Sequence, residues 1–276
     1  MSSHPWIFRA LLGMLCATFV TTAQADPLRV SGTGALLTSV KQLLEPFLRE
    51  HPDILMQFYF PPVGTSGAIR ALTDQQMEIA LTGRPLKKEE EAAGLVQYSL
   101  GASPFAFVVH RDSPVREVTM QQLVDIYAGR LKTWPDGSRI RVILRPVADA
   151  DTAILSNISP AMREALAAAH ANRQPGSALA DTDIDLVEMV EKVPGSVGSV
   201  AMTLVLSEKR PLKGLTVDGI APTTAAMENK EYPHAKPTFV VIRGDASREV
   251  RAVVDYLLAP ERKKSLMQLG IAPAPR

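Results

Sequence analysis

Three times in this chain, a short apolar, strand-like run gives way to small and hydroxyl residues and then continues as a helix-like pattern. The three loops are Ser31-Gly32-Thr33-Gly34, Gly64-Thr65-Ser66-Gly67 and Pro146-Val147-Ala148-Asp149-Ala150-Asp151-Thr152. Repeated strand–loop–helix units are typical of an α/β fold with largely parallel sheets. A helix N-terminus offers unpaired amides and about half a positive charge. Several such loops at one cleft would therefore each supply part of a binding site for a small anion.

The first two loops have the composition of an anion site. Thr33, Thr65 and Ser66 supply hydroxyl groups, and the glycines beside them, such as Gly34, allow the backbone to approach a ligand closely. Serine and threonine are also favoured residues for capping helices. Ligand binding and simple helix capping both remain open for these loops.

The third loop is less plainly suited to an anion, because it carries Asp149 and Asp151 after Arg145. The Arg145 guanidinium could donate two parallel hydrogen bonds to a tetrahedral oxyanion, or it could pair with either aspartate. The aspartates could cap the following helix, and in the cleft they would repel a dianion. One carboxylate could still accept a hydrogen bond from a protonated anion.

The N-terminus predicts export. Arg9 precedes an apolar run from Ala10 to Val20, and Ala23-Gln24-Ala25 forms a small-x-small cleavage site before Asp26. The run is shorter than the roughly 20 residues that a membrane span needs, which argues against an anchor. Leu15 stands before Cys16 where a lipidation signal needs a small residue. We expect residues 1–25 to be a cleavable signal peptide and the mature protein to be periplasmic.

The mature chain lacks several kinds of chemistry. It contains no cysteine, since Cys16 precedes the cleavage site, and removal of Arg9 reduces 30 basic residues to 29 against 29 acidic ones. Neither a thiol site nor a basic surface for nucleic acid is expected. The five histidines show no metal-ligand spacing, and no nucleophile elbow, P-loop or dinucleotide fingerprint occurs. We predict no enzyme activity, catalytic residue, metal or cofactor.

Periodicity places alternating strands and helices along the mature chain. Strands are expected at 28–31, 54–60, 79–81, 105–109, 140–144, 197–202, 215–218 and 238–242, and helices at 36–48, 68–72, 123–127, 161–171 and 248–258. The segment 172–181 is polar and is expected to be a loop. A crossing between two lobes is expected near His110-Arg111-Asp112.

Several stretches resemble, in order, the periplasmic phosphate-binding proteins of ABC transporters. The most specific is VDIYAGRLKTW at Val124 to Trp134, similar to that family's I-F-x-G-x-x-x-x-W motif. The others are Leu28 to Ala35, Gly64 to Gly67, Leu81 to Leu86 with its R-P-L, Pro194 to Val200, Val217 to Pro222, and Tyr232-Pro233. Together they span nearly the whole mature chain.

The resemblance implies a type II periplasmic binding protein fold, with two α/β lobes joined by two crossing strands around a ligand cleft. Lobe 1 is expected at 26–110 and 236–276, and lobe 2 at 111–235. Closure of the lobes on the ligand would be the working motion. The resemblance carries ligand contacts onto Thr33, Gly34, Ala35, Ser66 and Arg145. Together with the hydroxyl and third-loop residues, the predicted binding set is Thr33, Gly34, Ala35, Thr65, Ser66, Arg145, Asp149, Asp151 and Thr152.

Two positions depart from the family pattern. Gly83 stands where the family has an aspartate that accepts the proton of bound phosphate, and Ala148 to Thr152 replaces an S-G-T after the arginine. Two explanations are open. Either Asp149 or Asp151 has taken over the proton-accepting role, or the ligand is not phosphate.

The resemblance implies a monomeric substrate-binding protein that captures a small oxyanion, with phosphate the leading candidate, and presents it to an inner-membrane ABC permease. The alternative is a sensor or accessory module of the same fold, with an altered cleft and no role in phosphate transport. No nucleic-acid partner is expected.

Overall fold

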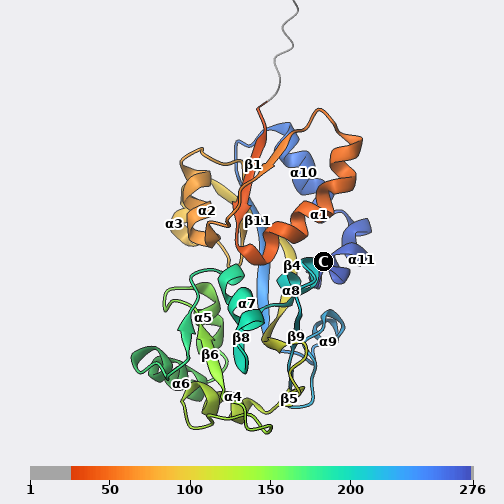
Figure 1. Cartoon of the computed structure of the whole chain (residues 1–276). Coiled ribbons are helices and arrows are strands. Elements are labelled where there is room, and N and C mark those ends of the chain that lie inside the picture. The colour runs from red at the N-terminus through yellow and green to blue at the C-terminus, as the bar shows by residue number, and fades with distance from the viewer. Residues whose placement is uncertain (1–25, 275–276) are drawn as a thin grey trace, which may run out of the picture.

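The computed structural model describes residues 26–274, which form two α/β lobes stacked end to end and joined by two long strands (Figure 1). The predicted signal peptide, residues 1–25, lies outside the described residues. A 9-stranded sheet runs through both lobes in the order β2-β1-β3-β11-β4-β8-β6-β7, with β9 paired to β4. This architecture confirms the predicted type II fold with two crossing strands.

The N-terminal part of the chain builds one end of the sheet, which we call lobe 1. Its elements are β1 (Leu28–Gly32), α1 (Gly34–Glu50), β2 (Met56–Phe58), α2 (Gly64–Thr73), β3 (Ile79–Thr82) and α3 (Lys88–Ala92). The C-terminal segment returns to this end as α10 (Arg248–Leu258), a 3-10 helix (Pro260–Arg262) and α11 (Lys263–Gln268).

The middle of the chain builds the other end, which we call lobe 2. Its first elements are β5 (Glu117–Val118), α4 (Met120–Tyr127), β6 (Arg141–Leu144), α5 (Ala150–Ser156), α6 (Pro160–Ala171) and β7 (Ala178–Leu179). They are followed by α7 (Asp183–Lys192), β8 (Ser196–Ala201), α8 (Met202–Ser207), β9 (Leu212–Gly214), β10 (Thr216–Val217) and α9 (Thr224–Glu228).

The two crossing strands are β4 (Leu95–His110) and β11 (Ala235–Arg243), which pair with each other in antiparallel register. The chain enters lobe 2 within β4, because Phe105 already pairs with Ala201 of β8. The crossing therefore lies earlier than the expected position at His110-Arg111-Asp112, inside one continuous strand. The domain limits at 110/111 and 235/236 stay a prediction.

The expected largely parallel sheet is only partly right. The β1–β2, β1–β3, β6–β7 and β6–β8 pairs are parallel. The crossing strands make antiparallel pairs, β11 with β3 and β4 with β8 and β9. Strands that helical crossovers connect all enter the sheet from the same end and are parallel. A crossing strand enters the lobe from the other end, so it is antiparallel to them. The expected loop at 172–181 also contains the short strand β7.

Apolar side chains fill both faces of the sheet in each lobe, as helix periodicity requires. In lobe 1, α1 and α10 cover one face, with Leu36, Leu44 and Val253 fully buried, and α2 covers the other with Leu72. In lobe 2, α4 and α6 pack around Phe107, while α7 and α8 cover the opposite face. Each lobe is thus a three-layer unit with helices on both faces of its sheet.

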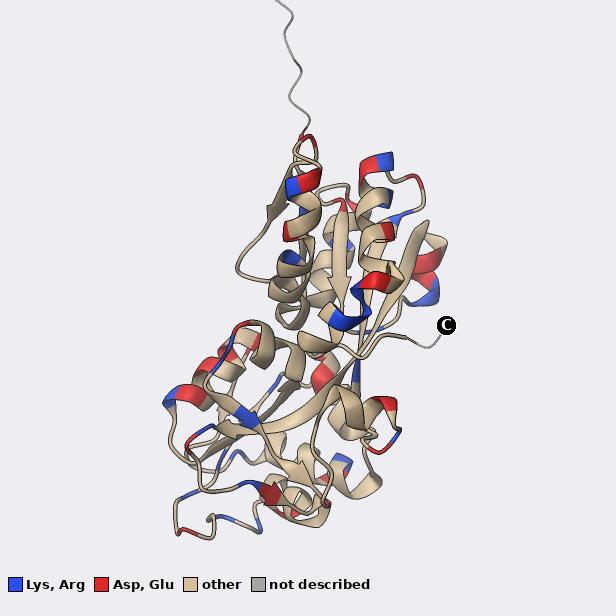
Figure 2. Ribbon diagram, turned by 90° about the vertical axis from the view of Figure 1, so that its right-hand side faces the viewer, with Lys and Arg blue, Asp and Glu red and all other residues tan. Residues whose placement is uncertain are grey.

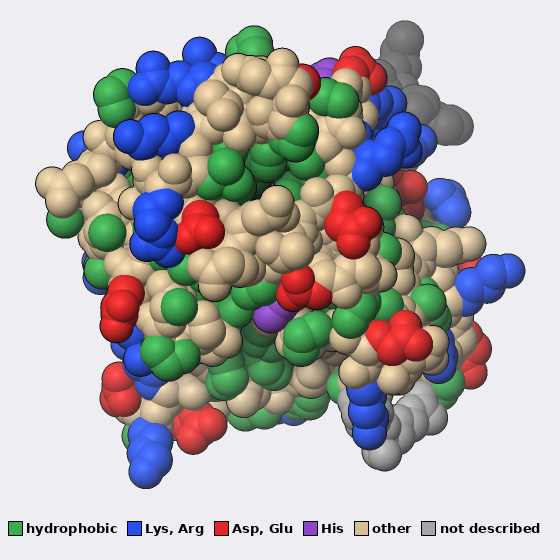
Figure 3. Space-filling view, turned by 90° about the horizontal axis from the view of Figure 1, so that it is seen from below, with side chains coloured by type: hydrophobic (Ala, Val, Ile, Leu, Met, Phe, Trp, Pro, Cys, Tyr) green, Lys and Arg blue, Asp and Glu red, His purple; other side chains and the backbone are tan. Residues whose placement is uncertain are grey.

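Charges of both signs are interspersed along the surface helices of both lobes (Figure 2). The end face of lobe 2, seen from below, also mixes basic and acidic side chains with apolar ones (Figure 3). No helix within residues 26–274 is long and apolar enough to cross a membrane.

Candidate ligand-binding site

The N-termini of helices α1 and α7 meet between the lobes. Thr33 follows β1 and directly precedes α1. Its position is fixed by its amide, which donates a hydrogen bond to the Leu81 carbonyl at 2.9 Å. Gly34 allows the close approach, because a Cβ at this position would lie 3.2 Å from the Ile184 side chain of α7. Two positive helix ends therefore face each other across the cleft.

The Asp183 carboxylate lies between these two helix ends. Its Oδ2 accepts a hydrogen bond from the Thr33 hydroxyl at 2.7 Å and another from the Ala35 amide at 3.2 Å. Asp183 belongs to lobe 2, whereas both donors belong to lobe 1. An oxyanion of the protein itself thus occupies the donors that the sequence predicts for a ligand.

Lys236, on the crossing strand β11, adds a buried cation. Its Nζ lies 2.6 Å from Oδ1 of Asp151 and 3.3 Å from Oδ2 of Asp183. The side chains of Lys236 and Asp183 are each 4% exposed and that of Asp151 is 0% exposed. Water is therefore excluded, and these ion pairs act in a medium of low dielectric constant.

Arg145, at the end of β6, faces the same cluster from lobe 2. Its Nη1 donates to the Ala180 carbonyl and its Nη2 to Asp149, each at 2.8 Å, while Nη2 lies 3.8 Å from Asp183. Its Nε is buried and has no hydrogen-bond partner among the described residues. The Nε–H group is thus a buried donor that no described residue satisfies.

The two aspartates of the third loop have different roles. Asp149 caps α5, because its Oδ1 accepts from the Asp151 amide at 2.9 Å, and it pairs with Arg145. This confirms both the capping and the internal salt bridge that the sequence left open for Asp149. Asp151, in the first turn of α5, instead contacts Lys236 and lies in the core of the charged cluster.

The other predicted site residues lie at the margin of this cluster. The Thr65 hydroxyl accepts a hydrogen bond from the Gly83 amide at 3.0 Å, and Ser66 is exposed on the first turn of α2. The Thr152 hydroxyl donates to the Pro146 carbonyl at 2.8 Å within its own loop. The structure thus joins Thr33, Ala35, Arg145, Asp149 and Asp151 and leaves Ser66 outside.

The presence of glycine at position 83 is explained by the space that the Lys236 side chain needs. A Cβ at position 83 would lie 2.8 Å from Cε of Lys236. A side chain there would displace the lysine stem and draw Nζ away from Asp151 and Asp183. The residue that departs from the family pattern therefore leaves room for a cation in the cleft, where the pattern has an acid.

Two residues of the charged cluster, Asp183 and Lys236, were missed by the sequence analysis. Asp183 had a local signal, because Thr182 and Asp185 form a capping box that marks the start of α7. Lys236 had none, since an isolated lysine before a proline in a strand is ordinarily exposed. Only the fold shows that it is buried.

The two carboxyl groups beside Lys236 have opposite pKa shifts. Burial alone would raise the pKa of Asp183, but Lys236, Arg145 and the Thr33 hydroxyl hold it below its usual range. Asp151 lacks those donors, so burial and the nearby Asp183 charge outweigh Lys236 and raise its pKa to about 8. Burial would lower the pKa of Lys236, but Asp151 and Asp183 keep it above its usual value. Asp151 is therefore the group that holds a proton at neutral pH.

This proton makes the folding free energy depend on pH. Between the ordinary pKa of 3.8 and about 8, folded Asp151 is protonated whereas the unfolded residue is ionised. The folded state binds the extra proton, so this contribution is complete below pH 4 and is lost as pH rises to about 8. In urea unfolding, we expect Asp151→Asn to gain stability relative to the wild type over this range. Parallel pH profiles for the two proteins would contradict this assignment.

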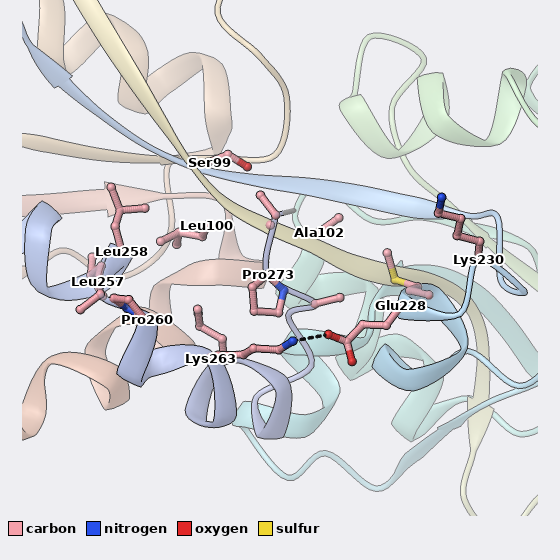
Figure 4. Close-up of a pocket in the computed structure, with 16 residues that line it drawn as sticks. Ser99, Leu100, Ala102, Glu228, Lys230, Leu257, Leu258, Pro260, Lys263 and Pro273 are labelled. Atoms are coloured by element: carbon pink, nitrogen blue, oxygen red, sulfur yellow. Dashed lines mark ion pairs between the residues drawn. The ribbon is translucent and has the colours of Figure 1, made fainter. Parts of the chain in front are cut away.

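A cavity of about 980 Å³ lies elsewhere, beside the crossing strands, where α9, α11 and the C-terminal segment meet. Leu257 and Pro273 line it, and the Lys263–Glu228 ion pair spans it at 3.0 Å (Figure 4). Its wall is largely apolar and lacks the convergent donors of the Asp183 cluster. The cluster between the lobes is the better candidate for ligand binding.

Two α/β lobes around a buried polar site at crossing strands define a two-lobed binding protein. The chain belongs to the PBP superfamily, whose domain model matches residues 18–261. The family is one of periplasmic binding proteins, which are non-enzymatic components of transport.

Similarity to individual proteins extends over most of the chain. The phosphate-binding protein PstS of Bacillus subtilis is 22% identical over 247 residues, covering 87% of this chain and 78% of its own length. Protein SphX of Synechococcus elongatus is 25% identical, covering 92% and 79%. The structure resembles that of a putative phosphate ABC transporter substrate-binding protein of Clostridium perfringens, with bound phosphate. That likeness has a TM-score of 0.75 at 20% identity and covers 91% of this chain and all of the other.

Proposed function

We propose that the protein is an extracytoplasmic substrate-binding protein that captures a small oxyanion, with phosphate first among the candidates, for an ABC permease. One observation carries this proposal. The Thr33 hydroxyl and the Ala35 amide both donate to one carboxylate oxygen, with Arg145 beside it. A site that holds a carboxylate in this way has the donors and the charge for an oxyanion ligand.

The structure around these donors supports anion binding. Helix α1 spans 17 residues and begins at Gly34, so its positive end is directed at the site. Arg145 has a planar fork of donors, and its buried Nε has no hydrogen-bond partner within the described part of the chain. Lys236 provides a second positive charge from the crossing strand.

The choice of phosphate is supported by the similar proteins. The relatives from B. subtilis and S. pneumoniae are named as phosphate-binding proteins, and the C. perfringens structure contains phosphate. The same similarity and the predicted signal peptide at residues 1–25 support a permease partner and a periplasmic location. We infer a monomer, the usual state of the family that the sequence resembles.

The acidic residues of the cleft favour a second candidate, a sensor or accessory module that does not transport phosphate. Asp149, Asp151 and Asp183 all lie in the cluster. Position 83, where the family pattern has an acid, is a glycine with the Lys236 side chain beside it. Such a cleft is less positive than a site devoted to a dianion would be. A module of this kind would keep the closed fold and bind phosphate weakly or not at all.

A thermal-shift titration of the chain from Asp26 separates the two candidates. Phosphate, sulfate, molybdate and a phosphonate are tested as separate ligands. A ligand at a hundred times its Kd adds about 2.7 kcal/mol to the stability. A rise in melting temperature with phosphate supports the transport function. A rise only with another oxyanion would identify that anion as the ligand in place of phosphate. No shift with any oxyanion would favour the accessory module.

Replacement of Arg145 tests the position of the site. We expect Arg145→Ala to weaken phosphate binding at least tenfold in calorimetry, since a charged hydrogen bond contributes roughly 1.5–3 kcal/mol. Arg145→Lys, which keeps the charge and loses the fork, should be intermediate. The exposed Arg163 of α6 provides the control, Arg163→Ala. Equal affinity in wild type and Arg145→Ala would place the ligand elsewhere.

A further inference from the structure

The contact of Asp183 with lobe 1 has the features of a bound ligand. Its oxygen accepts from a hydroxyl and a helix N-terminal amide of lobe 1, and its other neighbours are two cations, Lys236 and Arg145. Asp183 itself comes from the first position of α7 in lobe 2. The carboxylate thus bridges the lobes, which is the task of the ligand in a two-lobed binding protein.

The surrounding contacts show that the cleft is closed around this carboxylate. Ala35 of lobe 1 is buried within a lobe 2 core cluster that also contains Leu186 of α7. Farther along α1, Ser39 contacts the Thr203 hydroxyl of α8 at 2.7 Å, and the Gln42 amide donates to the Ser207 carbonyl at 2.8 Å. Helix α1 of lobe 1 is thus in direct contact with α7 and α8 of lobe 2.

Charge balance favours this closed state. Lobe 2 brings three aspartates and one arginine to the cleft, whereas Lys236 stands on the crossing strand. Separation of the lobes would remove the Asp183 carboxylate from the Thr33 hydroxyl and the Ala35 amide. The room for Lys236 depends on Gly83, and Lys236 in turn contacts Asp151 of the third loop. The two departures from the family pattern therefore belong to the same charged cluster.

We propose that Asp183 is an intramolecular occupant of the oxyanion site, which closes the lobes without ligand and which an external oxyanion must displace in order to bind. The apparent affinity of an external anion is then reduced by the fraction of molecules in which Asp183 holds the site. Asp183 therefore sets the concentration at which the protein responds to its ligand.

Lobe closure can be measured with two spin labels. The chain from Asp26 has no cysteine, so Glu91→Cys on α3 and Glu164→Cys on α6 give one exposed label in each lobe. In the wild-type background, we expect a narrow interlabel distance that phosphate does not shorten. With Asp183→Ala, the distance without phosphate should become longer and broader. With phosphate added, it should return to the wild-type value.

The matched control is Asp181→Ala, which removes the same charge from an exposed position two residues before Asp183. It should leave the distance distribution unchanged. Asp183→Asn keeps a hydrogen-bond acceptor without the charge and should open the lobes partly. The closure assignment is overturned if Asp183→Ala retains the narrow wild-type distance, or if phosphate shortens the distance in the wild type.

Calorimetry on the same proteins tests the displacement. We expect phosphate to bind Asp183→Ala on the order of tenfold or more tightly than wild type, and Asp181→Ala to match wild type. Weaker binding by Asp183→Ala would show that Asp183 assists the ligand and would overturn displacement. The gain in affinity presupposes that the cleft takes phosphate, whereas closure by Asp183 does not. Opening by Asp183→Ala with no phosphate binding in any variant would thus refute phosphate as ligand and retain the internal carboxylate.

Discussion

Replacement of Lys236 by methionine is expected to destabilise the fold by about 3–5 kcal/mol, because it leaves buried carboxyl groups without their cation. Lys236 is 3% exposed and contacts both Asp151 and Asp183. At about 2–4 °C per kcal/mol for a chain of this size, the melting temperature should fall by roughly 6–20 °C. Urea unfolding and differential scanning calorimetry measure the change.

Two further variants show whether the loss comes from the charge. Lys88→Met removes an exposed lysine from α3 and should change the stability by less than about 0.5 kcal/mol. Asp183→Asn together with Lys236→Met removes the carboxylate that the lysine compensates and should recover part of the loss. A Lys236→Met protein within 1 kcal/mol of wild type, by the same order-of-magnitude scale, would contradict the buried cluster.

The second large effect is expected at Gly32, the residue before Thr33. Gly32 pairs with Leu81 in the parallel register of β1 and β3, and a Cβ at Gly32 would lie 2.0 Å from the Leu81 carbonyl oxygen. Both groups belong to backbone within a sheet, so neither can turn aside. We expect Gly32→Ala to cost about 3 kcal/mol or more, at the upper end of overpacking effects.

Gly64 provides the comparison, because it lies in the second loop and has open space around its α-carbon. Its φ of 72° strains an alanine, but no atom lies within 4 Å of the added Cβ. Gly64→Ala should therefore cost about 1–2 kcal/mol, the price of the left-handed conformation alone. A cost for Gly32→Ala no greater than that for Gly64→Ala would contradict the close β1–β3 contact.

Local patterns were sufficient to predict helices such as α1, which positions the site, but not α7, which carries Asp183. The helix predicted at 36–48 corresponds to α1 (Gly34–Glu50), and the C-terminal helix matches α10 in full. Their apolar residues recur at helical spacing, so burial of one face fixes each helix independently of the rest of the fold. The loops before α1 and α5 were also correctly placed after strands.

Long-range electrostatics could not be predicted in the same way. The sequence placed Arg145 and Asp149 near one another because they are close along the chain. Asp183 and Lys236 are separated from each other by 53 residues, and from Thr33 by far more, so their contact depends on how the lobes close. A charged residue in a strand gives no local sign of burial, and its partners appear only in three dimensions.

The departure at Gly83 illustrates the limit of reading a motif alone. The sequence showed that an expected acid was absent and suggested Asp149 or Asp151 as its substitute. In the structure, Asp149 caps α5 and pairs with Arg145, and the space beside Gly83 holds the stem of Lys236. The absence of an acid at position 83 and the presence of Lys236 beside it are therefore linked, because the lysine needs the space that a side chain at position 83 would fill.

The most direct test of this site is a crystal structure of the chain from Asp26 grown with saturating phosphate. We expect phosphate to accept hydrogen bonds from the Thr33 hydroxyl, the Ala35 amide and Arg145, with the Asp183 carboxylate displaced from Ala35. A structure in which Asp183 still accepts from Thr33 and Ala35, with phosphate absent from the cleft or bound elsewhere, would contradict the oxyanion site.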